Sequence, residues 1–106
     1  MTPEGELKAA IRQLLRTFGI FHWNSWGGPM SAKGVPDILG CYKGRLIGIE
    51  VKTPRGVVSG DQERFIKNLN EAGGLAFVAR SVEDVIKGLG LEDRFLNFGG
   101  GDDTQK

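Results

Sequence analysis

The first half of the chain carries one helical pattern of apolar residues, followed by three short strand patterns. Thr2 and Pro3 have the form of a helix N-cap and first helical residue, and apolar residues recur at helical spacing behind them. Short apolar runs follow, separated by a glycine-rich loop at 26–34 and by the Lys43-Gly44 pair. The predicted elements are a helix from Pro3 to Phe18 and strands over 20–25, 35–42 and 45–53.

The second half predicts a helix, a buried strand and a further helix. Ser59-Gly-Asp-Gln62 has the form of a capping box, and the apolar face behind it ends before Gly73-Gly74. An apolar run over 75–79 is typical of a short buried strand. Ser81 then starts another helix, which is predicted to continue to about Leu89.

The order αβββαβα predicts an α/β protein with one domain over 1–90 and a loose acidic tail over 91–106. The chain has 106 residues, a formal net charge of +1, one cysteine and one histidine. The lone Cys41 excludes a disulfide framework and a cysteine metal cage, and no apolar stretch reaches the ~18 residues of a membrane span. We therefore expect a soluble, cytoplasmic protein whose small core would benefit from a partner subunit.

A two-residue turn at Lys43-Gly44 fixes the register of the predicted hairpin. Tyr42 then pairs with Arg45, and Asp37 lies directly opposite Glu50. Directly opposed side chains have Cβ atoms about 4.5–5.5 Å apart, where like charges destabilise the pairing. A divalent cation between the two carboxylates would offset this repulsion.

The face that carries Glu50 holds two further residues of interest. Because side chains alternate along a strand, Lys52 and Gly48 share this face, while Ile49 and Val51 point into apolar packing on the other. Gly48 is expected to leave room for a ligand to come close. The alternative is a solvent-exposed cluster of salt bridges, but the apolar neighbours favour a strand buried on both sides, where unpaired charge is costly.

Each of the first two predicted helices has one polar residue on its apolar side. At 100° per residue Glu4 falls within the apolar arc of the first helix, whereas Glu6 points away. Gln62 lies in the apolar arc of the second. Glu4 can instead complement the helix dipole, and Gln62 can complete the capping box with Ser59. Together with the opposed acids, the two residues predict one site built from four elements.

Three short motifs follow one another along the chain: Gly34-Val-Pro-Asp37, then Ile49-Glu-Val-Lys52, then Ser59-Gly-Asp-Gln62. In this order and spacing they resemble the PD-(D/E)xK nuclease superfamily and, more narrowly, the stand-alone form of the VRR-NUC family, the virus-type replication-repair nucleases. The resemblance covers roughly residues 4–86. It implies a restriction-endonuclease-like αβββαβ core with a mixed central sheet flanked by helices.

The resemblance also implies hydrolysis of phosphodiester bonds in DNA with Mg²⁺ or Mn²⁺ as the cofactor. The matching residues are the metal-binding Asp37, Glu50, Val51 (through its carbonyl) and Glu4, the catalytic lysine Lys52 and the helix glutamine Gln62. Glu4 and Gln62 would position the water shell of the metal or the substrate. The products would carry 5′-phosphate and 3′-hydroxyl ends.

Stand-alone relatives resemble Holliday junction resolvases, so the resemblance implies a homodimer that cuts four-way junctions in branched DNA. A flap-cutting or less selective nuclease is an alternative with the same chemistry. Two other classes stay open, namely a non-catalytic DNA-binding domain of the same fold and a small protein-interaction domain.

The small net charge conceals a basic first half. Residues 1–58 carry eight basic and four acidic side chains, whereas 59–106 carry six and nine. Once a bound cation offsets the acids of the site, the first half presents a phosphate-facing side that includes Lys8, Lys43 and Arg45. The specific candidates for DNA contact are Lys33, Arg55, Arg12, Arg16 and Trp26. Trp26 either caps the edge of the core, which is favoured, or stacks on an unpaired base.

Overall fold

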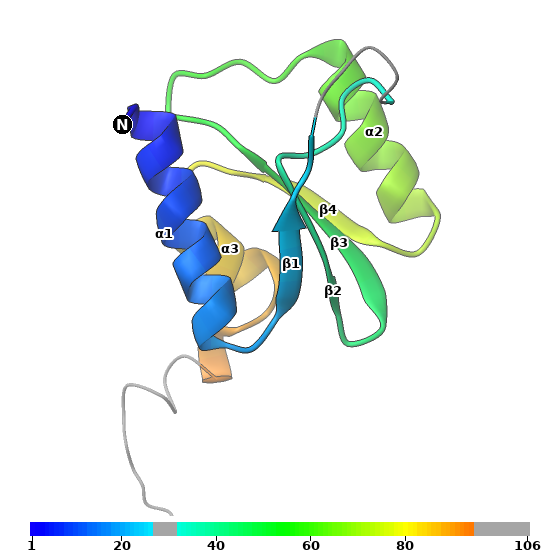
Figure 1. Ribbon diagram of the computed structural model, residues 1–106. Helices are drawn as coiled ribbons and strands as arrows, with labels where there is room; N and C mark the ends of the chain where they lie inside the picture. Colours follow the sequence, from blue (N-terminus) through cyan, green and yellow to red (C-terminus); the bar gives the residue numbers. More distant parts are fainter. Residues whose placement is uncertain (27–31, 95–106) are drawn as a thin grey trace, which may run out of the picture.

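The computed structural model describes residues 1–26 and 32–94 and confirms the predicted order of elements (Figure 1). The elements are α1 (Pro3–Thr17), β1 (Phe21–Asn24), β2 (Ile38–Tyr42), β3 (Arg45–Val51), α2 (Gly60–Glu71), β4 (Leu75–Ala79) and α3 (Val82–Gly88). Side chains cap α1, α2 and α3, since Thr2, Ser59 and Ser81 each accept a hydrogen bond from a backbone N–H in the first turn.

The four strands form one mixed sheet in the order β1-β2-β3-β4, antiparallel except for the parallel pair β3–β4. The predicted register of the hairpin is confirmed, because Tyr42 pairs with Arg45 and Ile38 pairs with Ile49. Lys43 and Gly44 form the turn with φ of 53° and 78°, as a two-residue turn with both central residues left-handed requires. β2 begins later than predicted and β3 ends earlier, so the ladder stops one residue short of Asp37.

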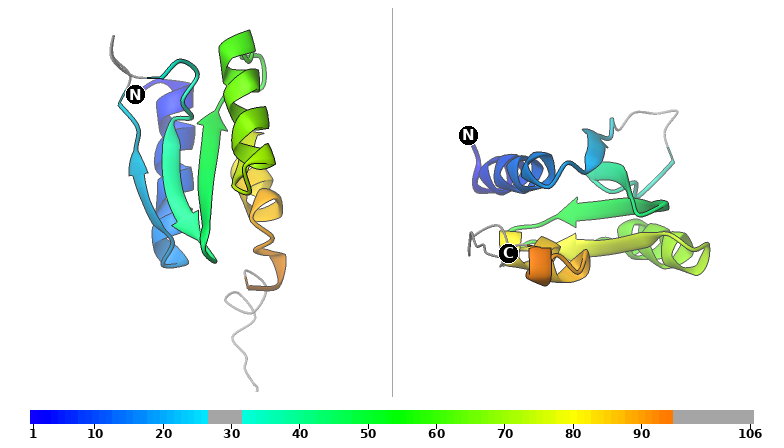
Figure 2. Two further views of the ribbon diagram at one scale, coloured as in Figure 1. Left: turned by 90° about the vertical axis from the view of Figure 1, so that its right-hand side faces the viewer. Right: turned by 90° about the horizontal axis from the view of Figure 1, so that it is seen from below.

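Helices cover the two faces of the sheet unequally. α1 and α3 pack on one face, while α2 lies over β3 and β4 on the other, so that β1 and β2 have no helix above them on the α2 side (Figures 1 and 2). None of the helices in the described ranges is long and apolar enough to cross a membrane.

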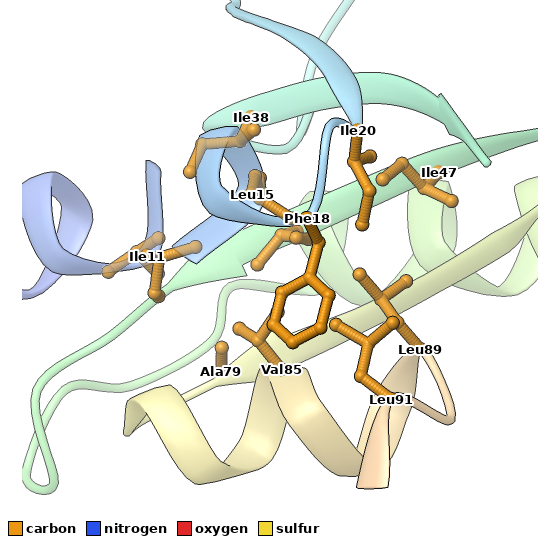
Figure 3. Packing of buried hydrophobic residues seen from close by; sticks show 12 residues of the cluster. Ile11, Leu15, Phe18, Ile20, Ile38, Ile47, Ala79, Val85, Leu89 and Leu91 are labelled. Carbon is orange, nitrogen blue, oxygen red and sulfur yellow. The ribbon is translucent and has the colours of Figure 1, made fainter. Parts of the chain in front are cut away.

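The core lies between the sheet and the pair α1 and α3. Ile11 and Leu15 of α1 are fully buried against Val85 of α3, and Phe18 closes the end of this cluster (Figure 3). The remaining members of the cluster are Ile20, Ile38, Ile47, Ile49, Val51, Ala79, Leu89 and Leu91. Burial of Ile49 and Val51 confirms the predicted apolar face of β3.

The prediction that a loose tail begins at residue 91 is wrong. Leu91 is fully buried in the core. Arg94 donates hydrogen bonds of 3.2 Å to the Phe18 carbonyl and to the Tyr42 hydroxyl, and its guanidinium lies 4.9 Å from the centre of the Phe18 ring. The folded part of the chain therefore includes Arg94, whereas 95–106 lie outside the described residues.

Gly48 does not leave room for a ligand, contrary to prediction. A Cβ atom at this position would lie 2.9 Å from Pro36 Cγ and 3.2 Å from Leu69 Cδ2. The missing side chain instead lets α2 and the Pro36 ring pack directly on β3.

Gly48→Ala should therefore destabilise the fold by about 1–3 kcal/mol, the usual cost of overpacking a close contact. Urea unfolding followed by circular dichroism measures this change. Gly60→Ala is the matched control, because a Cβ there meets nothing within 4 Å. It should leave stability unchanged or raise it by up to ~1 kcal/mol. Equal stability of Gly48→Ala and the wild type would contradict the packing role of Gly48.

Candidate active site

Asp37 is held at the point where the β2–β3 ladder ends. Its Oδ2 accepts a hydrogen bond of 2.9 Å from the Val51 backbone N–H. Its own carbonyl accepts one of 2.9 Å from the Ser25 N–H, so β1 fixes its backbone. Continuation of the confirmed register places Asp37 opposite Glu50. The Asp37 carboxylate is close enough to raise the pKa of Glu50, in agreement with the predicted pair of neighbouring carboxylates.

Glu50 is the only buried charged residue within the described part of the chain, with 3% of its surface exposed. Its Oε2 accepts a hydrogen bond of 2.9 Å from Gln62 Nε2 and lies 3.6 Å from Lys52 Nζ. Its Oε1 is buried and has no hydrogen-bond partner among the described residues. An unpaired carboxylate oxygen in this environment is costly unless a cation meets it.

Gln62 performs both of the roles that the sequence allowed. Its side-chain oxygen accepts a hydrogen bond of 2.8 Å from the Ser59 N–H, and its own N–H donates to the Ser59 hydroxyl, which completes the capping box. Because the cap occupies the amide oxygen, the amide nitrogen is directed to Glu50. A glutamate would also complete the cap, but it would present a third carboxylate with no donor.

Gly34 lets the first turn of α2, which carries Gln62, pack directly against the backbone before Asp37. It has φ of +79°, and a Cβ on it would lie 2.2 Å from the Asp61 carbonyl oxygen and 2.8 Å from the Gln62 nitrogen. Any side chain at this position would displace the turn. The first motif therefore supplies Asp37 directly and, through Gly34, fixes the helix from which Gln62 reaches the site.

The loop that follows Lys52 is held by Arg80, a residue that sequence reasoning missed. One guanidinium nitrogen of Arg80 donates to the carbonyls of Thr53 at 2.7 Å and Gly56 at 2.8 Å. Thr53 and Gly56 lie 27 and 24 residues before Arg80 in the sequence. An isolated arginine between a strand and a helix cap gives no sign of such distant contacts. The contacts fix the loop that carries Arg55.

The first helix brings Lys8, not Glu4, into contact with the acids. Lys8 Nζ lies 3.7 Å from Asp37 Oδ1. Glu4 lies one turn earlier on α1 and is exposed, so the prediction that it points toward the core is wrong. Helical phase places both residues on one side of the helix, but the first turn extends beyond the packed layer.

The candidate DNA contacts lie in different parts of the molecule. Lys33 directly precedes Gly34, Arg55 lies three residues after Lys52, and both are exposed. Arg16 is exposed at the far end of α1, and Arg12 is half-buried with its Nε buried and without a hydrogen-bond partner in the described ranges.

Two further basic residues and the tryptophan also depart from the predictions. Lys43 and Arg45 lie at the hairpin turn, the opposite end of β3 from Glu50, and Arg45 donates to the Gly73 and Gly74 carbonyls. They do not line the site. Trp26 is 87% exposed, which rules out the favoured role of capping the core edge. Residues 27–31 of its loop lie outside the described residues.

The electrostatics of the site centre on Glu50. Burial and, to a smaller extent, the neighbouring Asp37 carboxylate raise the pKa of Glu50 from 4.5 to about 7, while Lys52 opposes both effects. A carboxyl group perturbed in this way, beside a lysine and a second acid, is typical of a functional site.

The donor set fits a hard divalent cation. Each acid has one oxygen that accepts a hydrogen bond from an N–H group, at Val51 or Gln62, and one oxygen without such a bond from the described residues. Within the described ranges, no three His, Cys, Asp or Glu side chains lie close enough together to hold one metal ion. Mg²⁺ in proteins is often held by one or two carboxylates and keeps several waters, so two acids suffice.

The raised pKa of Glu50 predicts that the metal-free protein loses stability as pH rises from about 4.5 to 7. In this window the folded state keeps a proton on Glu50 that the unfolded chain releases, so the folded state binds more protons and is disfavoured as they are removed. Thermal unfolding in EDTA from pH 4 to 8, compared with Glu50→Gln, measures the effect. Each kcal/mol corresponds to roughly 4–8 °C in a domain of this size.

The difference in Tm between the wild type and Glu50→Gln isolates this group, because all other groups titrate in both proteins. The wild type should lose Tm relative to the variant as pH rises. Parallel curves for the two proteins would contradict the assignment of a raised pKa to Glu50.

Comparison with known proteins agrees with the geometry of the site. A family model described as the VRR-NUC domain matches residues 3–83, which include the acids, Lys52 and Gln62. A solved structure described as a VRR_NUC domain protein superposes with a TM-score of 0.68 and 17% sequence identity, covering 92% of this chain and 91% of the other. A search of curated proteins finds no match. The chain is a nuclease-type domain that belongs to the VRR-NUC family.

Proposed function

We propose that the protein is a Mg²⁺- or Mn²⁺-dependent endonuclease that hydrolyses phosphodiester bonds in branched DNA. The observation that carries the proposal is the pair Asp37 and Glu50. One Glu50 oxygen is buried and has no hydrogen-bond partner within the described ranges, and Lys52 Nζ lies 3.6 Å from the other. A protein that only bound DNA would gain little from burying an acid beside a second acid, because DNA is itself an anion.

Asp37 and Glu50 would hold the cation in this proposal, together with the carbonyl of Val51, the residue whose N–H already binds Asp37. When bound, the cation supplies Lewis-acid polarisation of the scissile phosphate and lowers the pKa of a bound water. Lys52 places its positive charge beside the phosphate, where negative charge develops in the transition state, and orients the attacking water. Its side chain is 17% exposed, so solvent screens this charge little.

Gln62 and Glu4 have supporting roles in this scheme. Gln62 holds Glu50 in one orientation through the capping box, which spares the entropy of ordering that carboxylate at each turnover. The assignment of Glu4 to the water shell of the cation rests on the family resemblance alone, because this side chain is exposed and Lys8, one turn later, is the α1 residue that meets Asp37. Lys33 and Arg55 bind the flanking phosphates.

The substrate in this proposal is a four-way junction that a homodimer cuts, as in Holliday junction resolvases. Support for a second subunit comes from the side of the sheet that α2 leaves open, where three large apolar side chains, two on β1 and one near the start of β3, are exposed. Phe21 is 70% exposed, Trp23 41% and Leu46 45%, and the rings of Phe21 and Trp23 lie 5.6 Å apart. Apolar patches of this kind mark interaction surfaces. Flap cleavage by a single subunit is the alternative.

Glu50→Ala or Lys52→Ala should lower cleavage by at least ~10²-fold, the usual cost of removing a group that stabilises the transition state. A panel of duplex, flap, splayed-arm and four-way DNA, incubated with Mn²⁺ or EDTA, measures activity and branch preference together. Lys67→Gln is the control, because Lys67 lies on α2 in an exposed pair with Glu71. Cutting in EDTA, or undiminished cutting by Glu50→Ala, would refute the proposed nuclease.

Phe21→Glu should convert the protein from a dimer to a single chain of 11.5 kDa. The dimer would bury the new carboxylate in an apolar contact with no opposite charge beside it, which is costly. Sedimentation equilibrium or light scattering at the concentration of the cleavage assay gives the mass. Lys67→Glu changes an exposed residue on α2 and should leave the dimer intact. A wild type with the mass of one chain at that concentration would argue against paired cuts at a junction.

A further inference from the structure

Each acid of the pair has one oxygen bound by a protein N–H and one that is not. Asp37 Oδ2 accepts from Val51 and Glu50 Oε2 accepts from Gln62, both at 2.9 Å. The remaining oxygens are Glu50 Oε1, which lacks a hydrogen-bond partner in the described part of the chain, and Asp37 Oδ1, 3.7 Å from Lys8 Nζ. The oxygens left for a cation are therefore one unpaired atom and one atom paired with Lys8.

We propose that Lys8 competes with the divalent cation for Asp37 Oδ1 and, once displaced, binds a DNA phosphate beside the site. The proposal rests on the metal-dependent nuclease function proposed above. It gives Lys8 two successive partners of the same charge, first a carboxylate and then a phosphate.

The Lys8–Asp37 pair is built to be exchanged. The side chains of Lys8 and Asp37 are 31% and 25% exposed, and their separation of 3.7 Å is long for an ion pair. Pairs of this exposure contribute little to stability because solvent screens them. Asp37 also keeps its hydrogen bond to Val51 when Lys8 leaves, so its orientation does not depend on the pair.

Lys52 differs from Lys8 in both respects. Its side chain is 17% exposed, and it faces Glu50 Oε2, the oxygen already bound by Gln62. A cation at Glu50 Oε1 does not have to displace it. When a cation binds, Lys52 therefore stays beside Glu50, while Lys8 leaves Asp37 for a new partner.

Position favours phosphate as the second partner of Lys8. Its ammonium stands at the edge of the acid pair, on the exposed N-terminal half of α1, and a cation bound by both acids would repel it outward from Asp37. Under the proposed function the scissile phosphate meets the cation held by these acids and so comes close to Lys8, which offers three donors on a flexible stem.

The test compares the wild type, Lys8→Gln and the matched control Lys67→Gln, which also removes one positive charge from a surface ion pair. Mn²⁺ binding without DNA is followed by calorimetry. Lys8→Gln should bind Mn²⁺ about two- to fivefold more tightly than the wild type, in keeping with an ion pair of this exposure, and Lys67→Gln should match the wild type. Equal or weaker binding by Lys8→Gln would overturn the competition.

Binding of duplex DNA is then measured by fluorescence anisotropy, with all three proteins carrying Lys52→Met to prevent cleavage. With Mn²⁺ present, Lys8→Gln should bind DNA more weakly than its parent, and the salt slope of log K should fall by about 0.9, the value for one phosphate contact. In EDTA the difference should shrink. An unchanged slope with Mn²⁺ would overturn the phosphate contact.

The outcomes separate this proposal from the function on which it rests. A wild-type protein that takes up no Mn²⁺ would refute the metal-dependent nuclease itself. A wild type that binds Mn²⁺ and cuts DNA, beside a Lys8→Gln variant that binds both ligands as the wild type does, would refute the role of Lys8 alone.

Discussion

The candidate site depends on one unfavourable arrangement, the burial of the Glu50 carboxylate beside that of Asp37. Desolvation and like-charge repulsion both oppose ionisation of Glu50. The surrounding chain offsets part of this cost, through the Val51 N–H on Asp37, the Gln62 amide on Glu50 and Lys52 beside it. None of these groups reaches Glu50 Oε1. The arrangement is costly for the protein by itself, and under the proposed function a bound cation would offset that cost.

Local rules were enough to predict most of this arrangement from the sequence. The turn at Lys43 and Gly44 fixed the register, because a two-residue hairpin loop allows one pairing of the strands. The register then placed Asp37 opposite Glu50. Helical phase predicts that Gln62 points inward, and the capping box predicts that it caps the helix. Both predictions are confirmed, because the amide oxygen accepts from the Ser59 N–H while the amide nitrogen donates to Glu50. The order of elements and the mixed sheet followed from periodicity and from the family resemblance.

Features that depend on distant parts of the chain escaped prediction. Helical phase gave the direction of Glu4 but not what lies opposite the first turn, so Lys8 was the residue found at Asp37. A strand pattern predicts space for a ligand at Gly48 because it does not say which helix covers that position. Arg80 binds a loop 24 to 27 residues before it, and no local pattern marks such a contact.

The C-terminal segment, predicted to be loose from residue 91, determines how much chain the fold requires. The family match ends at residue 83, inside α3, yet Val85, Leu89 and Leu91 fill the core beside α1. Arg94 closes that core by binding the Phe18 carbonyl at the end of α1. A chain cut at the end of the recognisable motifs would keep every residue of the site and leave the inner side of α1 bare. The minimal folding unit of this nuclease-type domain is therefore longer than its signature, because truncation at residue 83 would keep every residue of the site but remove side chains that the core requires.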